Sequence, residues 1–361
     1  MVLSKRLGWI GVDIGTRCIK LAQVARTAGG VRLRHAAVIQ RSVPWTDDSG
    51  LAHAKPNSSD GEIRAALECS DFKGRSAACV LPMNVCELRG LNVPNGDDHE
   101  RRAMIANELA DDWANLPFPM EFDFWDLEVD RSVPTAEAFN VDVLAVARPW
   151  IAQVAHDCQH ARLDCWAVDG GPLAISRAVA LIKPLQSGQR VLAVDWGFSN
   201  STLCVVGSGG PLYARTIHQC TFRSGLEAIV TELGVTMDHA QHIADTHGVV
   251  HSPDSSGGQD GVQAAVAAVL ADPVAELVGE IERTLRFFEL QRRHLRPSSI
   301  VLMGGGASVR NIGPYLSEML ELPVNIWHMP AESNERGGIL GGSISLFGPA
   351  VALSTLAWGG V

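Results

Sequence analysis

Two aspartates in the sequence each end an apolar run and stand two residues before a glycine. Asp13 lies in Ile10-Gly-Val-Asp-Ile-Gly-Thr16, and Asp195 lies in Leu192-Ala-Val-Asp-Trp-Gly-Phe198. The second segment follows the first at a constant offset of 182 residues, and the likeness continues through the next apolar stretch. One Asp-x-Gly after an apolar run arises easily by chance. Two copies, each inside a strand-turn-strand pattern, indicate an internal duplication.

The glycines of these segments suit a site for phosphate groups. A glycine at the tip of a hairpin lets backbone N–H groups approach phosphate oxygens, which predicts phosphate contacts at Gly15 and Gly197. Hydroxyl donors stand nearby, at Thr16 in the first segment and at Ser199 and Thr202 in the second. Plain β-hairpins with turn residues would explain one segment, but not an aspartate at the end of a buried strand in both.

Three charged side chains complete the expected site: two carboxylates for a metal ion and one ammonium group for a phosphate. A carboxylate cannot donate a hydrogen bond to phosphate, but it can hold the water ligands of a Mg²⁺ that bridges phosphates. We therefore expect Asp13 and Asp195 to act on a magnesium ion through water, and to be the catalytic residues of any hydrolysis. Lys20 is expected to bring a positive charge to the transferred phosphate. Two such hairpins facing each other would hold a triphosphate between them.

A third glycine-rich segment follows a later apolar run. Gly304, Gly305 and Gly306 come directly after Ile300-Val-Leu-Met and before a helical pattern. The Rossmann fingerprint G-x-G-x-x-G is not met, because Val309 holds its last glycine position. We expect instead a glycine shelf against which adenine and ribose lie. A turn that packs a strand closely against a helix would have the same sequence.

The elements that must position these residues alternate between strands and helices. Apolar runs predict strands over 8–24, 31–39, 77–81, 87–93, 139–147, 299–303 and 324–327. Helical spacing predicts helices over 98–113, 150–161, 273–295 and 312–320, and the Ser/Gly/Asp-rich stretch 251–261 predicts a loop. This alternation indicates an α/β fold.

Composition narrows the function classes. The chain has 361 residues, enough for two domains, and its net charge of -10 argues against nucleic-acid binding, which needs clustered Lys and Arg. Its eight cysteines form no C-x-x-C pair, which predicts reduced thiols, a cytoplasmic compartment and no structural metal. The segment 338–361 carries no charge and is long enough to cross a bilayer, but its glycines, its serines and Pro349 predict a buried core segment instead.

In their order along the chain, these features resemble the actin, sugar-kinase and DnaK-type superfamily, whose domains have an actin-like (ribonuclease H-like) fold. Within it the chain is similar to the PilM family of type IV pilus assembly. Besides the first hairpin, the resemblance rests on Asn107–Phe118, Val168–Arg177, Val194–Gly197, Arg283–Gln291 and Leu302–Ser308.

The resemblance implies a domain order. It places the first half of domain I at 1–76 and an inserted subdomain, of the kind that this family shares with the cell-division protein FtsA, at 77–165. A connecting helix region of domain I follows at 166–189, then domain II at 190–337, and the segment 338–361 returns to domain I.

The resemblance also implies a function. PilM-like proteins are cytoplasmic scaffolds that bind ATP or ADP with Mg²⁺. They dock the short cytoplasmic peptide of a PilN-like inner-membrane protein near the extra subdomain, and so lie at the periphery of the inner membrane among other pilus assembly proteins. Whether the chain associates with itself stays open.

Two departures from the family pattern bear on hydrolysis. The family commonly has an acidic residue just before a Pro-x-Ala in the connecting helix; here that place is Gly171, and Asp169 is the remaining catalytic candidate nearby. The family's Ala-Glu-x-x-Lys helix, which borders the sugar of the nucleotide, has Gln241 and Ala244 in place of the acid and the lysine. We therefore expect weak or absent hydrolysis.

The second hairpin tip is also bulkier than usual, with Trp196 and Phe198. These departures weaken the expectation of hydrolysis more than that of binding. A scaffold that binds no nucleotide, a small-molecule kinase of the same superfamily, and an FtsA-like division protein stay as alternatives. The last should end in a basic amphipathic helix, which the segment 354–361 lacks.

Overall fold

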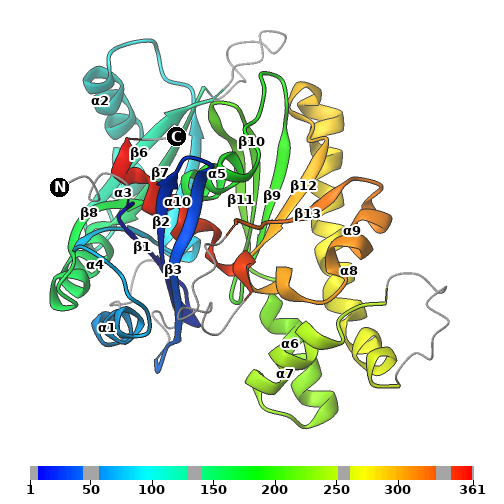
Figure 1. The fold of residues 1–361 in the computed structure, drawn as a ribbon. Helices are drawn as coiled ribbons and strands as arrows, with labels where there is room; N and C mark the ends of the chain where they lie inside the picture. The colour runs from blue at the N-terminus through cyan, green and yellow to red at the C-terminus, as the bar shows by residue number, and fades with distance from the viewer. Residues whose placement is uncertain (1–6, 44–56, 128–139, 251–260, 331–342, 360–361) are drawn as a thin grey trace.

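The computed structural model describes residues 7–43, 57–127, 140–250, 261–330 and 343–359. Within them the duplication is visible as two five-stranded sheets of equal topology (Figure 1). The first, in the order β3-β2-β1-β4-β8, contains β1 (Ile10–Ile14), β2 (Cys18–Thr27), β3 (Gly30–Gln40), β4 (Ser76–Val80) and β8 (Asp164–Asp169). The second, in the order β11-β10-β9-β12-β13, contains β9 (Val191–Trp196), β10 (Ser201–Gly207), β11 (Gly210–Ile217), β12 (Ser299–Met303) and β13 (Val324–Ile326).

Helices lie between the two sheets and cover their outer faces. A buried apolar cluster joins α5 (Gly171–Ile182) and α10 (Gly348–Ser354) to inward-facing residues of both sheets. The outer face of the first sheet packs against α1 (Asp60–Glu68) and α4 (Arg148–His160). The outer face of the second packs with α6 (Phe222–Leu233), α7 (Met237–Thr246), α8 (Gly261–Gln291) and α9 (Ile312–Leu320). Layers therefore alternate helix, sheet, helix, sheet, helix.

The α10 helix explains a glycine in β1. Every residue of α10 is buried, and a Cβ placed on Gly11 would lie 1.8 Å from the carbonyl oxygen of Ala350. Only glycine allows the strand and the helix to approach this closely. The charge-free C-terminal stretch, as far as the structure describes it, is thus a core segment, and none of the described helices has the length and apolarity to span a membrane.

A third, smaller sheet has its own core. Its antiparallel order is β5-β7-β6, from β5 (Cys86–Leu91), β7 (Val141–Ala147) and β6 (Met120–Asp126), and α2 (Asp98–Glu108) and α3 (Ala110–Trp113) accompany it. Ile105, Leu109 and Val143 are central to its apolar cluster. β4 is a strand of the first sheet, and α4 packs against the outer face of that sheet. We therefore propose the bounds 86–147 for the inserted subdomain, within the expected 77–165.

Some expected elements differ from the observed ones. The helix expected over 273–295 is α8, which begins at Gly261 and runs through Pro273. The helix expected over 98–113 divides at Leu109 into α2 and α3, and β6 was not predicted. Of the predicted loop 251–261, residues 251–260 lie outside the described part of the chain.

Candidate functional site

A cavity of about 490 Å³ lies where the carboxyl ends of the parallel strands of both sheets meet. It is lined by the turns after β1 and β9, the ends of β4 and β12, the start of α5 and one face of α7. The predicted residues that line it are Asp13, Gly15, Thr16, Lys20, Asp195, Gly197, Ser199, Thr202, Gly304 and Gly305. Its size is within the range of small-molecule sites, roughly 300–1,000 Å³.

The two hairpins have the tight turns that their glycines predict. The Gly15 N–H donates to the Cys18 carbonyl oxygen at 3.1 Å, and a Cβ on Gly15 would lie 2.8 Å from that oxygen. In the second hairpin, a Cβ on Gly197 would lie 2.4 Å from the Asn200 carbonyl oxygen. Any larger residue would therefore displace the turn.

The tips of the hairpins meet across the cavity. The Thr16 and Ser199 hydroxyl oxygens are 2.6 Å apart, so one hydroxyl donates a hydrogen bond to the other. The two tips come from different sheets. A phosphate group entering between them would find hydroxyl donors on both sides.

Of the two strand-end aspartates, only Asp13 faces a cationic residue on the neighbouring antiparallel strand. In register, Lys20 of β2 lies opposite Asp13 of β1, and its ammonium donates to the Asp13 carboxylate at 2.7 Å. At the matching position of the second sheet, Thr202 of β10 lies opposite Asp195 of β9. Burial alone would lower the pKa of Lys20, but the negative charges of Asp13, Cys18 and Asp195 together outweigh burial and raise it.

Asp195 consequently has an unusual carboxyl group. Burial raises its pKa to about 6, and the Asp13 charge adds to this while Lys20 opposes it. A carboxylate that is costly to hold without a cation is well suited to a divalent ion. Asp13 and Asp195 thus fit the expected magnesium site, and their roles there stay predictions.

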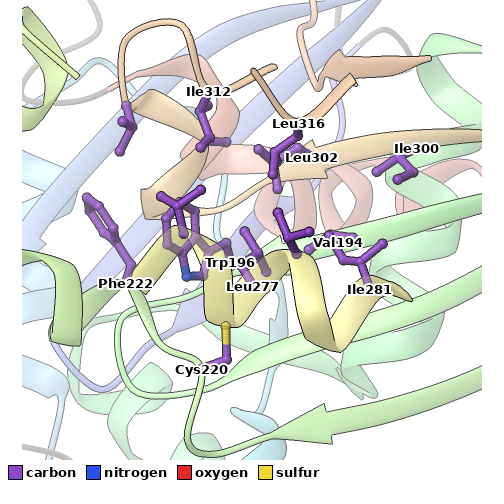
Figure 2. Close-up of a cluster of buried hydrophobic side chains, with 14 of the residues drawn as sticks. Val194, Trp196, Cys220, Phe222, Leu277, Ile281, Ile300, Leu302, Ile312 and Leu316 are labelled. Carbon is purple, nitrogen blue, oxygen red and sulfur yellow. The ribbon is translucent and has the colours of Figure 1, made fainter. Parts of the chain in front are cut away.

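The glycine turn packs against the end of β9. Gly304 has a positive φ of 87°, and a Cβ on it would lie 2.2 Å from the Asp195 carboxylate. A Cβ on Gly306 would lie 2.1 Å from the Trp196 ring, so Gly306 faces the core and is not among the cavity-lining residues. Trp196 is fully buried, is not among the described residues that line the cavity, and packs beside Phe222 (Figure 2), with 5.3 Å between the ring centroids.

Phe198, the other bulky residue of the second tip, does line the cavity. Two guanidinium groups lie over its ring, Arg17 at 4.8 Å and Arg223 at 5.6 Å from the centroid. Arg17 also donates to the Asp238 carboxylate at 2.9 Å, and Gln40 donates to the same oxygen at 2.7 Å. These contacts, here called the clasp, join domain I to α7 and the second hairpin.

Gly171 lies at the cavity as the first residue of α5, and a sulfur atom occupies the space beside it. A Cβ on Gly171 would lie 2.9 Å from the Met83 Sδ atom. Met83, which also lines the cavity, therefore occupies the space in which a side chain at position 171 would begin.

Asp169 is held away from the cavity. Its carboxylate pairs with Arg177 of α5 and accepts a hydrogen bond from the Gly170 N–H at 2.9 Å. It is not among the described residues that line the cavity. Burial raises the pKa of Asp169, and Arg177 lowers it. The ion pair gives Asp169 a structural role, and its catalytic role stays a prediction without geometric support.

One face of α7 lines the cavity, and the sequence prediction named Gln241 on this helix but missed Asp238 and Asp245. Asp238, Gln241 and Asp245 line the cavity at helical spacing, whereas Ala244 is fully buried. Asp245 accepts hydrogen bonds from Gln241 at 2.9 Å and from Ser308, beside the glycine turn, at 2.5 Å. The i, i+3, i+7 spacing of these polar residues was the available signal.

A comparison with protein families shows to which family the chain belongs. The sequence profile of the family described as Type IV pilus assembly protein PilM matches residues 11–338, which include both hairpins and the glycine turn. The chain belongs to the PilM family. This membership confirms the resemblance found in the sequence and favours it over the small-molecule kinase and FtsA-like alternatives.

Comparison with solved structures agrees with this assignment. A chain of a PilM-PilN type IV pilus biogenesis complex matches with a TM-score of 0.72 over 97% of this chain and 98% of that chain, at 22% identity. The ethanolamine utilization protein EutJ from Carboxydothermus hydrogenoformans matches with a TM-score of 0.53 over 96% and 89%, at 12% identity. At these identities the likeness is one of fold. This PilM-family chain therefore has the predicted actin-like fold.

Proposed function

We propose that this PilM-family protein is a nucleotide-binding scaffold of type IV pilus assembly that docks a PilN-like inner-membrane partner. The observation that carries the nucleotide-binding part is the meeting of two phosphate-type hairpins, from different domains, across one cavity. We propose ATP or ADP with Mg²⁺ as the ligand.

The residues at the cavity fit this ligand. The turn glycines leave room for phosphate oxygens at both tips, and the hydroxyl groups of Thr16 and Ser199 supply donors. Asp13 and Asp195 would hold the water ligands of Mg²⁺, which neutralises phosphate charge when bound. Gly304 and Gly305 would support the nucleoside, because both line the cavity and have no side chain.

Hydrolysis is proposed to be slow. The place of the family's acidic residue is a glycine with Met83 beside it, and Asp169 is engaged by Arg177. No carboxylate is thus aimed from the start of α5 at a water molecule next to the phosphates. Binding, in contrast, uses backbone groups, hydroxyls and the paired aspartates, all of which line the cavity.

Isothermal titration with ATP·Mg²⁺ tests the nucleotide-binding part. The wild type should show one binding event, and Asp195→Ala should weaken it at least tenfold. Asp142→Asn is the matched control, because Asp142 is also buried with a raised pKa, to about 7, and does not line the cavity. A flat titration of folded wild type would leave the scaffold without a nucleotide; equal loss in both variants would mean that Asp195 acts through folding alone.

The docking part rests on family membership and on the fold shared with a chain of a PilM-PilN complex. The protein would lie in the cytoplasm, at the periphery of the inner membrane through its partner. The inserted subdomain is the proposed docking region, and it exposes Met104 (38%) and Leu116 (37%) on its helical side.

A capture experiment tests the docking part. The cytoplasmic peptide of the PilN-like protein encoded by the same organism is immobilised, and retention of the chain on it is measured. Wild type should be retained, and Met104→Glu with Leu116→Glu should reduce retention. Met319→Glu, which changes an exposed methionine on α9 of domain II (50%), is the control and should bind as wild type does. Unchanged retention of the double variant would reject the inserted subdomain as the docking region.

A further inference from the structure

Three cysteines from distant parts of the chain converge on the outer face of the first sheet. Cys79 lies in β4, Cys158 in α4 and Cys165 in β8. The Cys79 and Cys158 sulfur atoms are 3.4 Å apart, those of Cys79 and Cys165 are 4.0 Å apart, and all three lie within 4.8 Å of one another. Cys79 and Cys158 are buried, while Cys165 is partly exposed.

A bulge in β8 brings the third sulfur to this face. Ala77 pairs with Cys165 and Ala78 pairs with Ala167, so Trp166 is an extra residue in the ladder. Without it, Cys165 and Ala167 would share a face, because side chains alternate along a strand. Instead Cys165 packs with the α4 side, where Cys79 lies, and Ala167 packs with the opposite side.

We propose that Cys79, Cys158 and Cys165 form a binding site for a soft, thiophilic metal ion with a filled d shell, Cu⁺ or Zn²⁺. Thiolates that share one tetrahedral zinc at about 2.3 Å lie about 3.8 Å from one another, and the observed sulfur spacings bracket this value. Three thiolates and no oxygen ligand select soft ions over Mg²⁺ or Ca²⁺.

The arrangement of the cluster is compatible with ion entry. Cys165 is the partly exposed member, so an ion can reach the cluster from its side. The thiols would give up protons as the ion binds, because the thiolate is the form that binds a metal. The exposed side also lets solvent stabilise the negative charge of the site.

Two simpler interpretations compete with the metal site. Free cysteines are often buried as small apolar residues, and a pair of them can form a disulfide. A disulfide would need the Cys79 and Cys158 sulfurs to close from 3.4 Å to about 2.05 Å and would leave Cys165 without a role. Neither interpretation requires the third sulfur, whereas a metal site does.

An occupied site would connect three elements near the cavity. Val80 and Leu81, directly after Cys79, line the cavity, and β8 leads into α5, whose first residue lines it too. An ion bound to all three cysteines would fix α4 to β4 and β8. The expected consequence is a metal-dependent rise in thermal stability, because an ion that binds only the folded state stabilises it.

The test uses the full-length protein, reduced and stripped of metal, titrated with Cu⁺ or with Zn²⁺ in competition with a chromophoric chelator. Wild type should bind one ion per chain, lose three reactive thiols and melt at a higher temperature with the ion. The ion that binds more tightly is the one that the site takes. Cu⁺ would be held by the three thiolates alone, and Zn²⁺ would need one water as a fourth ligand.

The variants decide whether the cluster is the site. Cys165→Ser and Cys165→Ala should each weaken binding at least tenfold and abolish the metal-dependent stabilisation, because they remove one thiolate at the partly exposed position. Cys69→Ser, at an exposed cysteine outside the cluster, and Cys204→Ala, at a buried one, should bind as wild type does. Absence of binding to both ions, or binding that survives in both Cys165 variants, would overturn the proposal.

Discussion

Thr16 and Ser199 lie 183 residues apart in the chain, yet their hydroxyl oxygens are 2.6 Å apart across the cavity. Each belongs to the tip of a hairpin that the other domain repeats. The contact therefore marks the place where the two halves of the duplication face each other. A phosphate group bound at both tips would replace this contact by hydrogen bonds from both hydroxyls to its oxygens.

Removing these hydroxyls should weaken nucleotide binding without unfolding the protein. Thr16→Val and Ser199→Ala are each expected to lower ATP·Mg²⁺ affinity roughly 10- to 150-fold, since a hydrogen bond to a charged group contributes about 1.5–3 kcal/mol. Thr27→Val removes the hydroxyl of an exposed turn elsewhere in the first sheet and should leave affinity unchanged. Titration of the three variants checks this; equal affinities throughout would place the phosphates elsewhere.

Asp195 should make stability depend on pH in a defined direction. Its pKa rises from about 3.8 to about 6 on folding, so the folded state holds the proton more tightly. The cost of burying the ionised group is absent below pH 4, grows as pH rises from 4 to 6, and is full above 6. Asp195→Asn should thus be more stable than wild type at pH 7.5, by about 1–3 kcal/mol.

The check is urea unfolding of both proteins at pH 7.5 and pH 4, without nucleotide. The difference in the free energy of unfolding should be present at the higher pH and vanish at the lower one. A variant that is less stable at pH 7.5 would mean that the Asp195 carboxylate is already well compensated by its surroundings.

Restoring an acidic residue at the start of α5 should raise hydrolysis, provided that space is made for it. Gly171→Glu alone should lower the melting temperature, because its Cβ would meet the Met83 sulfur at 2.9 Å. Adding Met83→Ala should recover stability and increase phosphate release over wild type. If the double variant released phosphate no faster than Met83→Ala alone, the missing carboxylate at position 171 would not be what limits hydrolysis.

We expect the clasp to affect the rate of nucleotide release more than the thermal stability of the protein. Arg17 and Asp238 are paired at the surface, where an ion pair contributes about 0–1 kcal/mol. Arg17→Ala should therefore leave the melting temperature nearly unchanged but speed release of a fluorescent ATP analogue several-fold, since it removes contacts between the domains. Arg75→Ala breaks a similar exposed pair with Asp164, outside the cavity, and should release the analogue as wild type does.

The hairpins and the sheets could be predicted because they are local patterns repeated at a fixed distance. Apolar runs, a turn glycine and the 182-residue offset together predict strand, turn and duplication without knowledge of packing. The glycine turn was also predicted from a local pattern, although Gly306 packs against Trp196 and does not face the cavity. The missed β6 carries the alternating pattern of a strand, with Phe122 and Phe124 on one face.

What the sequence did not reveal depends on packing between distant elements. Asp169 stands two residues before a cavity residue, but its ion pair with Arg177 holds it away. Met83 meets Gly171 only once distant segments of the chain are folded together, and the Arg17 guanidinium reaches Phe198 only when both hairpins are in place. The convergence of the three cysteines also depends on a bulge that no local pattern announces.

A structure of the protein with a non-hydrolysable ATP analogue and Mg²⁺ tests the central claim most directly. The account predicts the phosphates between the Gly15–Thr16 and Gly197–Ser199 turns, the magnesium ion on the Asp13 and Asp195 side, and the Thr16–Ser199 contact opened. A nucleotide bound outside this cavity, or an unaltered Thr16–Ser199 hydrogen bond at saturating analogue, would contradict it.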